Sequence, residues 1–429
     1  MNNPRPRILL VYPYASIDTN PTMALLLESL AERKVEVDVL LERSDDFLQP
    51  KLFGDSIHLE PLPNAFWELQ QIHARRLLKS VPKKLLVWYA HQAFANRLPK
   101  QFLVKILNSD RYHAPLNTNS AALKLLIERQ YSLIIGVDSH GIAFADHLNA
   151  WMNKRLVYIS FELIPSRELE SDYEKNLKRM EQIACEKASL VLIQDDERAA
   201  AFCQDNPLPD YKIVKVPVAP PPQEVAKSNY FRKILGLPAD KRIVLYSGAL
   251  ETWASRDQLS EMVSYWPDEY CLVIHLRSKP RARMALFLRQ LTETGKIHIS
   301  PHPVARADLP GLIASADYGL APYRPVPDNP ATGANVYHLG LSSGKVAYYA
   351  MCGLPILARS LPVFDREFAN YKCGKVYQKL AETGPLLEEM NSNYASYSDE
   401  ARRFYRERLN PVEGMHKFCN YLLDLAVKE

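Results

Sequence analysis

Residues 338–357 read HLGLSSGKVAYYAMCGLPIL, and this stretch decides which fold we expect. Two serines, a glycine and Lys345 stand at the start of an apolar run with helical spacing. A helix start leaves about four backbone N–H groups unpaired and carries partial positive charge, so it can bind an anion. The stretch is not a Walker loop, because Gly340 to Gly344 is one residue too short and Val346 replaces the magnesium-binding hydroxyl.

The local chemistry is consistent with a phosphate site of another kind. Ser342 or Ser343 is expected to cap the helix, and Gly344 lets the backbone approach a ligand closely. Lys345 in the first turn opposes the helix dipole, so it would destabilise the helix slightly without an anionic partner. A charge-assisted hydrogen bond to phosphate is worth about 1.5–3 kcal/mol and would reverse that sign. The alternative is that the serines are ordinary caps and Lys345 is solvated.

Short apolar runs alternate with amphipathic segments along most of the 429 residues. This alternation predicts an α/β fold with doubly wound parallel sheets, because strands covered on both faces read as continuous apolar runs. The strands that we expect are RILLVYPYA, VEVDVLLE, YSLIIGVD, RLVYISFEL and SLVLIQDD, followed after YKIVKVPV by RIVLYSGAL, YCLVIHL, KIHIS, DYGLAPY, LPILAR and KVYQ.

The proline-rich stretch PVAPPPQEVAKSN cannot belong to a central strand and is typical of an interdomain linker. We therefore expect two Rossmann-like domains, residues 1–218 and 219–409, that face a common cleft. The amphipathic segment 410–429 is expected to pack back on the first domain. Ligands of open α/β sheets bind at the carboxyl ends of the strands, so the cleft is the expected site.

The composition excludes several classes. The net charge of +4 is small for this length, the six cysteines form no CxxC pattern, and no apolar run is long enough for a membrane span. No Gly-rich dinucleotide fingerprint, GxSxG or HExxH motif is present, and Asp195-Asp196 reads as a helix cap rather than half a metal site. These features favour a cytoplasmic protein with reduced thiols, no cofactor and no catalytic metal.

The stretch SSGKVAYYAMCGLPILA resembles the C-terminal signature of nucleotide-sugar glycosyltransferases of the GT-B fold, group-1 (retaining) type. That signature has a small residue, Lys, an apolar residue and then Glu-Tyr-Met-Ala-Cys-Gly-x-Pro-Val-Ile-Ala. The residues that match it are Lys345, Tyr349, Cys352, Gly353 and Pro355. The resemblance implies that the second domain binds the donor nucleotide and the first domain binds the acceptor.

The resemblance also implies roles for particular residues of the second domain. It assigns the donor diphosphate to Lys345, Ser342, Ser343, Gly344 and Arg256, with Arg277 and Lys279 as second choices, and the nucleotide to Gly248 and Tyr348. The family usually carries two glutamates separated by seven residues, and these positions fall on Gly340 and Tyr348. Neither residue is a carboxylate, which leaves open a non-standard donor or lost activity.

In the first domain, Asp138 and His140 follow the strand of YSLIIGVD, and Glu162 follows the next strand. The resemblance places a histidine at the donor sugar or reacting centre, so His140 is the expected contact. A neutral imidazole can donate to a sugar hydroxyl or accept a proton near pH 7. Asp138 or Glu162 would serve as base if the enzyme inverts, and the sequence does not decide between them. The alternative for His140 is a helix cap.

Residues 69–109 contain eight Lys or Arg, no Asp or Glu, and several aromatic side chains. Such a segment can lie on an anionic membrane, where each cation near the surface contributes about 1 kcal/mol. The alternative is a pair of helices with a solvated basic face, and no recognition module suggests nucleic-acid binding. The resemblance therefore implies a glycosyltransferase that moves a sugar from a nucleotide sugar to a glycan or lipid-linked acceptor in bacterial cell-surface polysaccharide synthesis. With the basic segment, we expect a cytoplasmic protein that is peripheral on the inner face of the membrane. A catalytically silent GT-B protein that binds a sugar nucleotide or a partner as an assembly subunit is the alternative.

Overall fold

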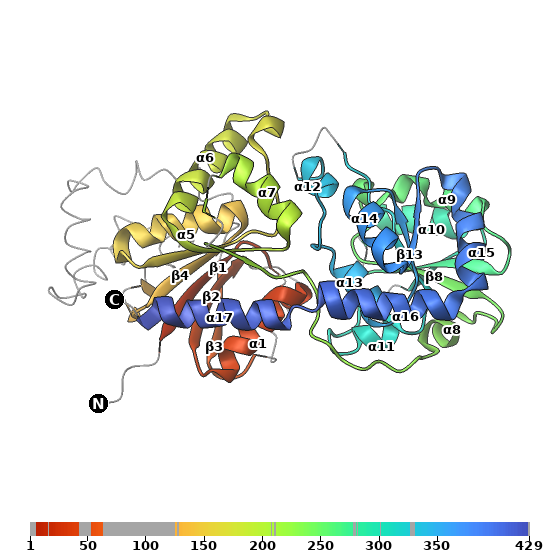
Figure 1. Cartoon of the computed structure of the whole chain (residues 1–429), viewed down its shortest axis with the longest axis horizontal. Coiled ribbons are helices and arrows are strands. Elements are labelled where there is room, and N and C mark those ends of the chain that lie inside the picture. The colour runs from red at the N-terminus through yellow and green to blue at the C-terminus, as the bar shows by residue number, and fades with distance from the viewer. Residues whose placement is uncertain are drawn as a thin grey trace.

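The computed structural model describes residues 6–15, 17–42, 53–62, 125–126, 128–206, 208–209, 212–277, 280, 282–300, 302–326 and 331–427. These residues form two α/β domains with parallel sheets of seven and six strands (Figure 1). The predicted fold class, two doubly wound parallel sheets, is confirmed.

The first sheet has the order β3-β2-β1-β4-β5-β6-β7, so its order reverses between β1 and β4. Its strands are β1 (Arg7–Tyr12), β2 (Glu36–Glu42), β3 (Ile57–Leu62), β4 (Leu133–Val137), β5 (Arg155–Ile159), β6 (Ala188–Ile193) and β7 (Ile213–Lys215). Strand β3 was not predicted, because this edge strand reads IHLEPL and carries charge and a proline instead of an apolar run.

Helices cover both faces of the first sheet. Ile8 and Leu10 of β1 belong to one hydrophobic core, with α1 (Pro21–Glu32) and α17 (Val412–Val427). Leu9 and Val11 point to the other core, which α5 (Asp138–Met152), α6 (Asp172–Lys187) and α7 (Asp196–Asp205) cover. This alternation buries the strands on both faces, which explains their continuous apolar sequence.

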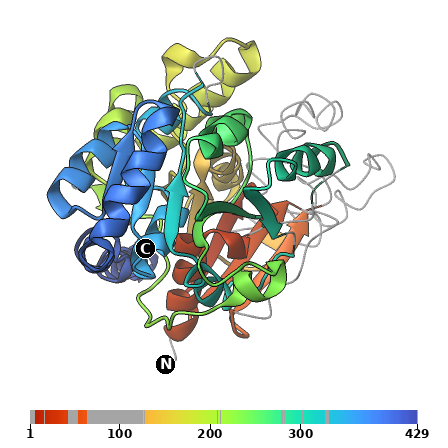
Figure 2. The ribbon, with the colours of Figure 1, turned by 90° about the vertical axis from the view of Figure 1, so that its right-hand side faces the viewer.

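The second sheet has the order β10-β9-β8-β11-β12-β13 and reverses between β8 and β11. Its helices lie on both sides of the sheet (Figure 2). The strands are β8 (Arg242–Ser247), β9 (Tyr270–His275), β10 (Ile297–Ser300), β11 (Tyr318–Ala321), β12 (Ile356–Arg359) and β13 (Gly374–Tyr377). The helices are α8 (Tyr230–Leu235), α9 (Leu259–Ser264), α10 (Ala282–Thr292), α11 (Leu309–Ile313), α12 (Ala334–Tyr337), α13 (Gly344–Met351), α14 (Pro362–Tyr371), α15 (Thr383–Ser392) and α16 (Tyr394–Phe404).

The chain crosses between the domains twice. Residues 217–229 contain no helix or strand and connect the first sheet to α8. At the other end, α16 packs in the second domain, a π-helical turn spans Tyr405–Leu409, and α17 then lies along the first domain (Figure 1). Met415, Phe418 and Leu422 of α17 are fully buried in the core of the first domain.

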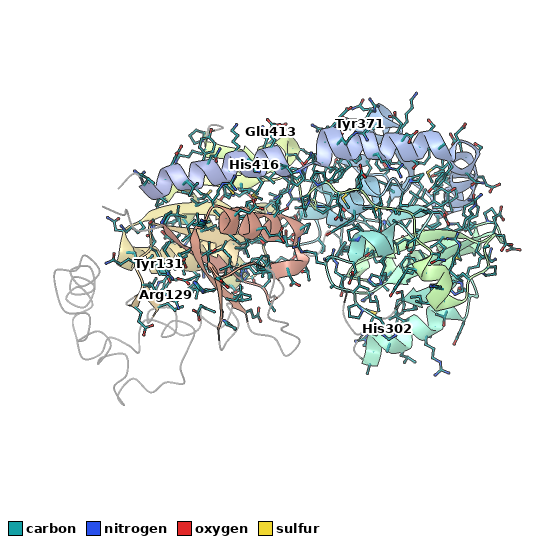
Figure 3. The ribbon with its side chains drawn as sticks, turned by 90° about the horizontal axis from the view of Figure 1, so that it is seen from below. Arg129, Tyr131, His302, Tyr371, Glu413 and His416 are labelled. Atoms are coloured by element: carbon teal, nitrogen blue, oxygen red, sulfur yellow. The ribbon has the colours of Figure 1, made fainter. Side chains whose placement is uncertain are left out.

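Asp38 of β2 is a buried carboxylate, and it contacts Arg129 and Tyr131, which are labelled next to each other in Figure 3. It accepts hydrogen bonds from Arg7 at 3.0 Å, Arg129 at 2.5 Å and Tyr131 at 2.8 Å. Asp38 is near the start of β2, away from the carboxyl ends of the strands, so this cluster is structural.

All six cysteines are free. Within the ranges given above, no helix is both long and apolar enough to cross a membrane. The basic segment 69–109, for which we predicted membrane association, lies outside the described residues.

Candidate functional site

Polar residues gather where the strand order of each sheet reverses, at the carboxyl ends of the strands. In the first domain, Tyr14 follows β1 and Asp138 follows β4, and the Tyr14 hydroxyl donates to Asp138 Oδ2 at 2.7 Å. In the second domain, Gly248 follows β8 and Tyr323 follows β11, and Lys345 lies close to both. Such reversal points are the usual ligand sites of doubly wound sheets.

The start of α13 shows which serine is the cap. Ser343 is the N-cap, because its hydroxyl accepts from the Val346 backbone N–H, and it also shares a 2.5 Å hydrogen bond with the Tyr323 hydroxyl. The Ser342 hydroxyl instead donates to the Leu339 carbonyl at 2.5 Å. A Cβ on Gly344 would lie 3.6 Å from side-chain atoms of Pro21 and Val218. The first turn of α13 therefore faces the first domain.

Lys345 is buried, with 6% of its surface exposed, and its Nζ has no hydrogen-bond partner among the residues that the structure describes. Three aromatic rings surround the ammonium, with ring centres 4.0 Å (Tyr246), 4.9 Å (Tyr323) and 5.5 Å (Trp253) away. Cation–π contacts offset part of the desolvation cost. Burial, with a smaller contribution from the charge of Arg277, lowers the pKa of Lys345 well below its ordinary value. Lys345 is therefore not a solvated surface lysine.

Gly248 lies beside this ammonium at the end of β8. Its φ of +137° is a conformation that side chains disfavour. An ideal Cβ at this position would lie 3.4 Å from Lys345 Cε and 3.5 Å from Nζ. The lysine side chain therefore lies directly against the backbone at the end of β8.

The other cationic candidates differ in their surroundings. Arg256 forms an ion pair with Glu251 at 3.3 Å. Arg277 follows β9, is exposed, and forms no ion pair with any residue that the structure describes. Its charge acts on Lys345 and on Tyr12 of the first domain, where it opposes the rise in the Tyr12 pKa. Arg277 is thus better placed than Arg256 to act beside Lys345, and Lys279 lies outside the described residues.

The two positions where the resembled family carries glutamates are closely packed. Tyr348 is 5% exposed, and burial raises the pKa of its phenol. Gly340 has a φ of +53°, and an ideal Cβ there would overlap Oδ2 of Asp195. A longer side chain at position 340 would not fit while Asp195 keeps this position.

On the first domain, Asp138 is buried and fully engaged. Its Oδ1 accepts from the backbone N–H groups of Phe161 at 2.6 Å and Glu162 at 2.9 Å, and its Oδ2 accepts from Tyr14. Burial and the neighbouring charge of Glu162 raise the pKa of Asp138 to about 7. These contacts suit a residue that orders the end of β5.

Glu162 has a different environment. One carboxylate oxygen accepts from the side-chain amide of Asn335, which belongs to the second domain. Burial raises the pKa of Glu162, and the charge of Arg198 and this hydrogen bond oppose the rise. A carboxyl group with a raised pKa at the junction of two domains suits proton transfer near neutral pH.

His140 lies in the first turn of α5, and its Nε2 is 3.0 Å from the Tyr173 hydroxyl. The helix has no side-chain cap, so the alternative that His140 merely caps this helix is wrong. Burial lowers the pKa of His140. A neutral imidazole is therefore favoured at pH 7.

Several residues that shape this junction were not predicted from the sequence. The chief ones are Arg198 of α7 and Asn335 of α12, two helices that face each other where the domains meet (Figure 1). Nothing in DERAAAF or ANVYHL marks them. The aromatic rings around Lys345 had a signal, because each lies in β8 or in the stretch just after β8 or β11.

Among the described residues, no group of three or more His, Cys, Asp or Glu could hold a metal ion. Asp195 caps α7, as predicted.

These two sheets and the junction between them define the GT-B glycosyltransferase fold. The structure is similar to sucrose-phosphate synthase from Thermosynechococcus elongatus, with a TM-score of 0.65 at 15% identity, covering 99% of this chain and 100% of that chain. HepE from Anabaena, solved in complex with UDP and glucose, gives 0.66 at 14% identity, with coverage of 98% and 100%. WaaG, a glycosyltransferase involved in lipopolysaccharide biosynthesis, gives 0.59 at 13% identity, with coverage of 98% and 100%.

At these identities the likeness establishes the fold alone. No protein-family model matches the sequence, and no curated protein matches it. The roles of individual residues therefore depend on the geometry of this chain.

Proposed function

We propose that the chain is a glycosyltransferase that moves a sugar from a nucleotide sugar to a glycan or lipid-linked acceptor, in the synthesis of cell-surface polysaccharide. The observation that carries the proposal is the buried ammonium of Lys345 at the start of α13, for which the described part of the chain supplies no hydrogen-bond acceptor. A buried charge of this kind is costly unless an anion completes the site. The diphosphate of a nucleotide sugar supplies that anion.

In this proposal the second domain stabilises the leaving diphosphate. Lys345, the backbone N–H groups of the first turn of α13 and Arg277 neutralise the negative charge that develops on it, which is preorganised electrostatic stabilisation. Arg256, which the resemblance made the first choice, becomes the second candidate, since it would first have to leave Glu251. Gly248 lies beside Lys345, and Tyr348 lies one helical turn after it. We place the nucleotide next to these two residues.

The first domain supplies the acceptor side. We assign Glu162 to the proton of the acceptor hydroxyl, because Asp138 already accepts three hydrogen bonds. Asp138 then orders Tyr14 and the end of β5, and His140 contacts the sugar. A nucleotide-sugar donor is supported by the structural comparison, because HepE was also solved in complex with UDP-glucose.

The test is a thermal-shift panel of UDP-, GDP-, ADP- and CMP-sugars on the wild type and on Lys345→Met, followed by product analysis with the best donor. We expect at least one donor to stabilise the wild type and to be turned over, and the variant to lose both effects. Stabilisation without turnover would favour the silent binding protein. The absence of carboxylates at Gly340 and Tyr348 supports that alternative. No stabilisation by any donor would overturn the proposal.

A further inference from the structure

The segment 331–343, which leads into α13, is held by residues of the first domain. Both carboxylate oxygens of Glu168 accept from the Ala334 backbone N–H at 3.0 Å. Asp195 accepts from the Leu341 N–H, and the Val218 N–H donates to the Leu341 carbonyl at 2.9 Å. The backbone that carries the helix start is therefore shaped by the neighbouring domain.

Arg198 is the centre of this contact. Its side chain is buried, with 1% exposed, and it donates from one nitrogen to the carbonyl of Phe161 at 2.5 Å in the first domain. In the second domain it donates to the His338 carbonyl at 2.9 Å, the Asn335 side-chain oxygen at 3.0 Å and the Ser342 hydroxyl at 3.3 Å.

This guanidinium is buried without a carboxylate at ion-pair distance among the residues that the structure describes, and its Nε has no partner. Its hydrogen bonds go to carbonyl, amide and hydroxyl oxygens, and the charges of Glu162 and Asp195 act on it only from beyond ion-pair distance. A buried charge in such surroundings is a poor source of stability. Its planar fork does, however, fix the direction of each group that it contacts. The geometry therefore fits positioning better than it fits stabilisation.

We infer that Arg198 is a positioning residue for the donor diphosphate, although it belongs to the acceptor-side domain. It fixes the backbone of residues 335–342, and through this backbone it sets where Ser343 and Lys345 present the helix start. The inference rests on the proposed function, because it needs a phosphate at α13. Beyond the proposed function, the inference states that the affinity for the nucleotide depends on the contact between the domains.

Arg198→Lys is the first variant, because an ammonium keeps the charge but cannot donate in the fixed fork that reaches both domains. Arg366→Lys is the matched control, since Arg366 also crosses between the domains, to Glu197 at 3.0 Å, but forms no hydrogen bond or ion pair with the described segment 331–343. Glu197 itself pairs with His338 at 3.5 Å, and the conservative Arg366→Lys change keeps both of these side chains. Asn335→Ala is the second variant and removes the same link from the other domain.

The measurement is the dissociation constant and stoichiometry of UDP by calorimetry, with GDP, ADP and CDP if the wild type prefers one of them. We expect Arg198→Lys and Asn335→Ala to weaken binding about tenfold or more, as for a lost charge-assisted hydrogen bond, with unchanged stoichiometry and near wild-type affinity for Arg366→Lys. A purely structural role would lower the binding-competent fraction and leave the affinity intact, and this result would overturn the inference.

Loss of folding in both variants would also overturn it, because Arg198 would then be a stability residue. If the wild type and Arg366→Lys bind UDP and the two variants bind it equally well, the inference fails while the proposed function stands. If the wild type binds none of the four nucleotides, the proposed function fails, and the inference fails with it.

Discussion

The carboxylate of Asp195 occupies the space that a side chain on Gly340 would need. Asp195 is the N-cap of α7 in the first domain, and its Oδ1 accepts from the Arg198 N–H at 2.9 Å. Its Oδ2 accepts from the Leu341 N–H, which follows Gly340 in the second domain. One carboxylate therefore caps the start of a helix in the first domain and binds the loop before α13 in the second domain.

Gly340→Ala is expected to destabilise the protein. The left-handed conformation at φ +53° costs a residue with a Cβ about 1–2 kcal/mol, and overlap with Asp195 adds to this cost. Asp195→Ala removes the overlap, so the double variant should lose less than the sum of the single variants. Urea unfolding measures all three, and additive losses would show that the two positions do not interact.

Lys345→Met is expected to raise stability while it removes donor binding. Met has similar length and needs no hydrogen-bond partner, so the unpaired polar group, worth about 1–3 kcal/mol, disappears. The pKa of Lys345 is lowered in the folded state, so the unfolded state binds more protons below the ordinary pKa of 10.5. Wild-type stability therefore rises as the pH approaches 10.5, and the gain from Met is largest at lower pH.

Thermal unfolding of Lys345→Met at pH 7 and pH 9.5 checks this prediction. Lys187→Met is the control, because Lys187 is half-exposed and pairs with Asp146 far from α13. A variant less stable than the wild type at pH 7 would show that the lysine stabilises the fold.

Nucleotide binding should be accompanied by proton uptake. An anion at Lys345 favours the charged amine and so raises the pKa that burial has lowered. Calorimetry at pH 8.5 in Hepes and in Tris, whose ionisation enthalpies differ, should give different apparent binding enthalpies for the wild type. Equal enthalpies in the two buffers would mean that no proton is taken up.

Asp138→Asn should change how stability depends on pH. The folded-state pKa of Asp138 is raised from 3.8 to about 7, so the folded state binds the extra proton between these values. Wild-type stability therefore falls from pH 4 to pH 7 through this group. Asn keeps the two acceptor contacts to the backbone N–H groups of Phe161 and Glu162, and it does not ionise.

Relative to the wild type, Asp138→Asn should thus be more stable at pH 8 than at pH 5 in urea unfolding. The opposite trend would mean that the three hydrogen bonds lower the pKa of Asp138 more than burial raises it.

The sheets and the Lys345 helix could be predicted from sequence because their signals are local. Continuous apolar strands and the serine–lysine helix start each follow from neighbouring residues. The edge strand β3 lacked such a run and was missed. The choice of Ser343 over Ser342 as the cap depends on a one-residue boundary, which local sequence does not fix.

The contact between the domains could not be predicted, since it depends on residues far apart in the chain. Arg198 and Asn335 are separated by 137 positions, and each lies in a segment without an unusual motif. The aromatic rings around Lys345 had a local signal, because they lie in β8 or just after β8 and β11, but their meeting at one ammonium depends on the fold. Only the folded chain brings these side chains together.

The most direct test measures how much the diphosphate group adds to the affinity for a nucleotide. Calorimetry would compare UDP, GDP, ADP and CDP with their nucleosides, for the wild type and Lys345→Met. We expect at least one diphosphate to bind the wild type about tenfold or more tightly than its nucleoside, a difference of about 1.4 kcal/mol or more, and the variant to lose this preference. Equal affinity of diphosphate and nucleoside, or an unchanged preference in Lys345→Met, would contradict a phosphate site at the start of α13.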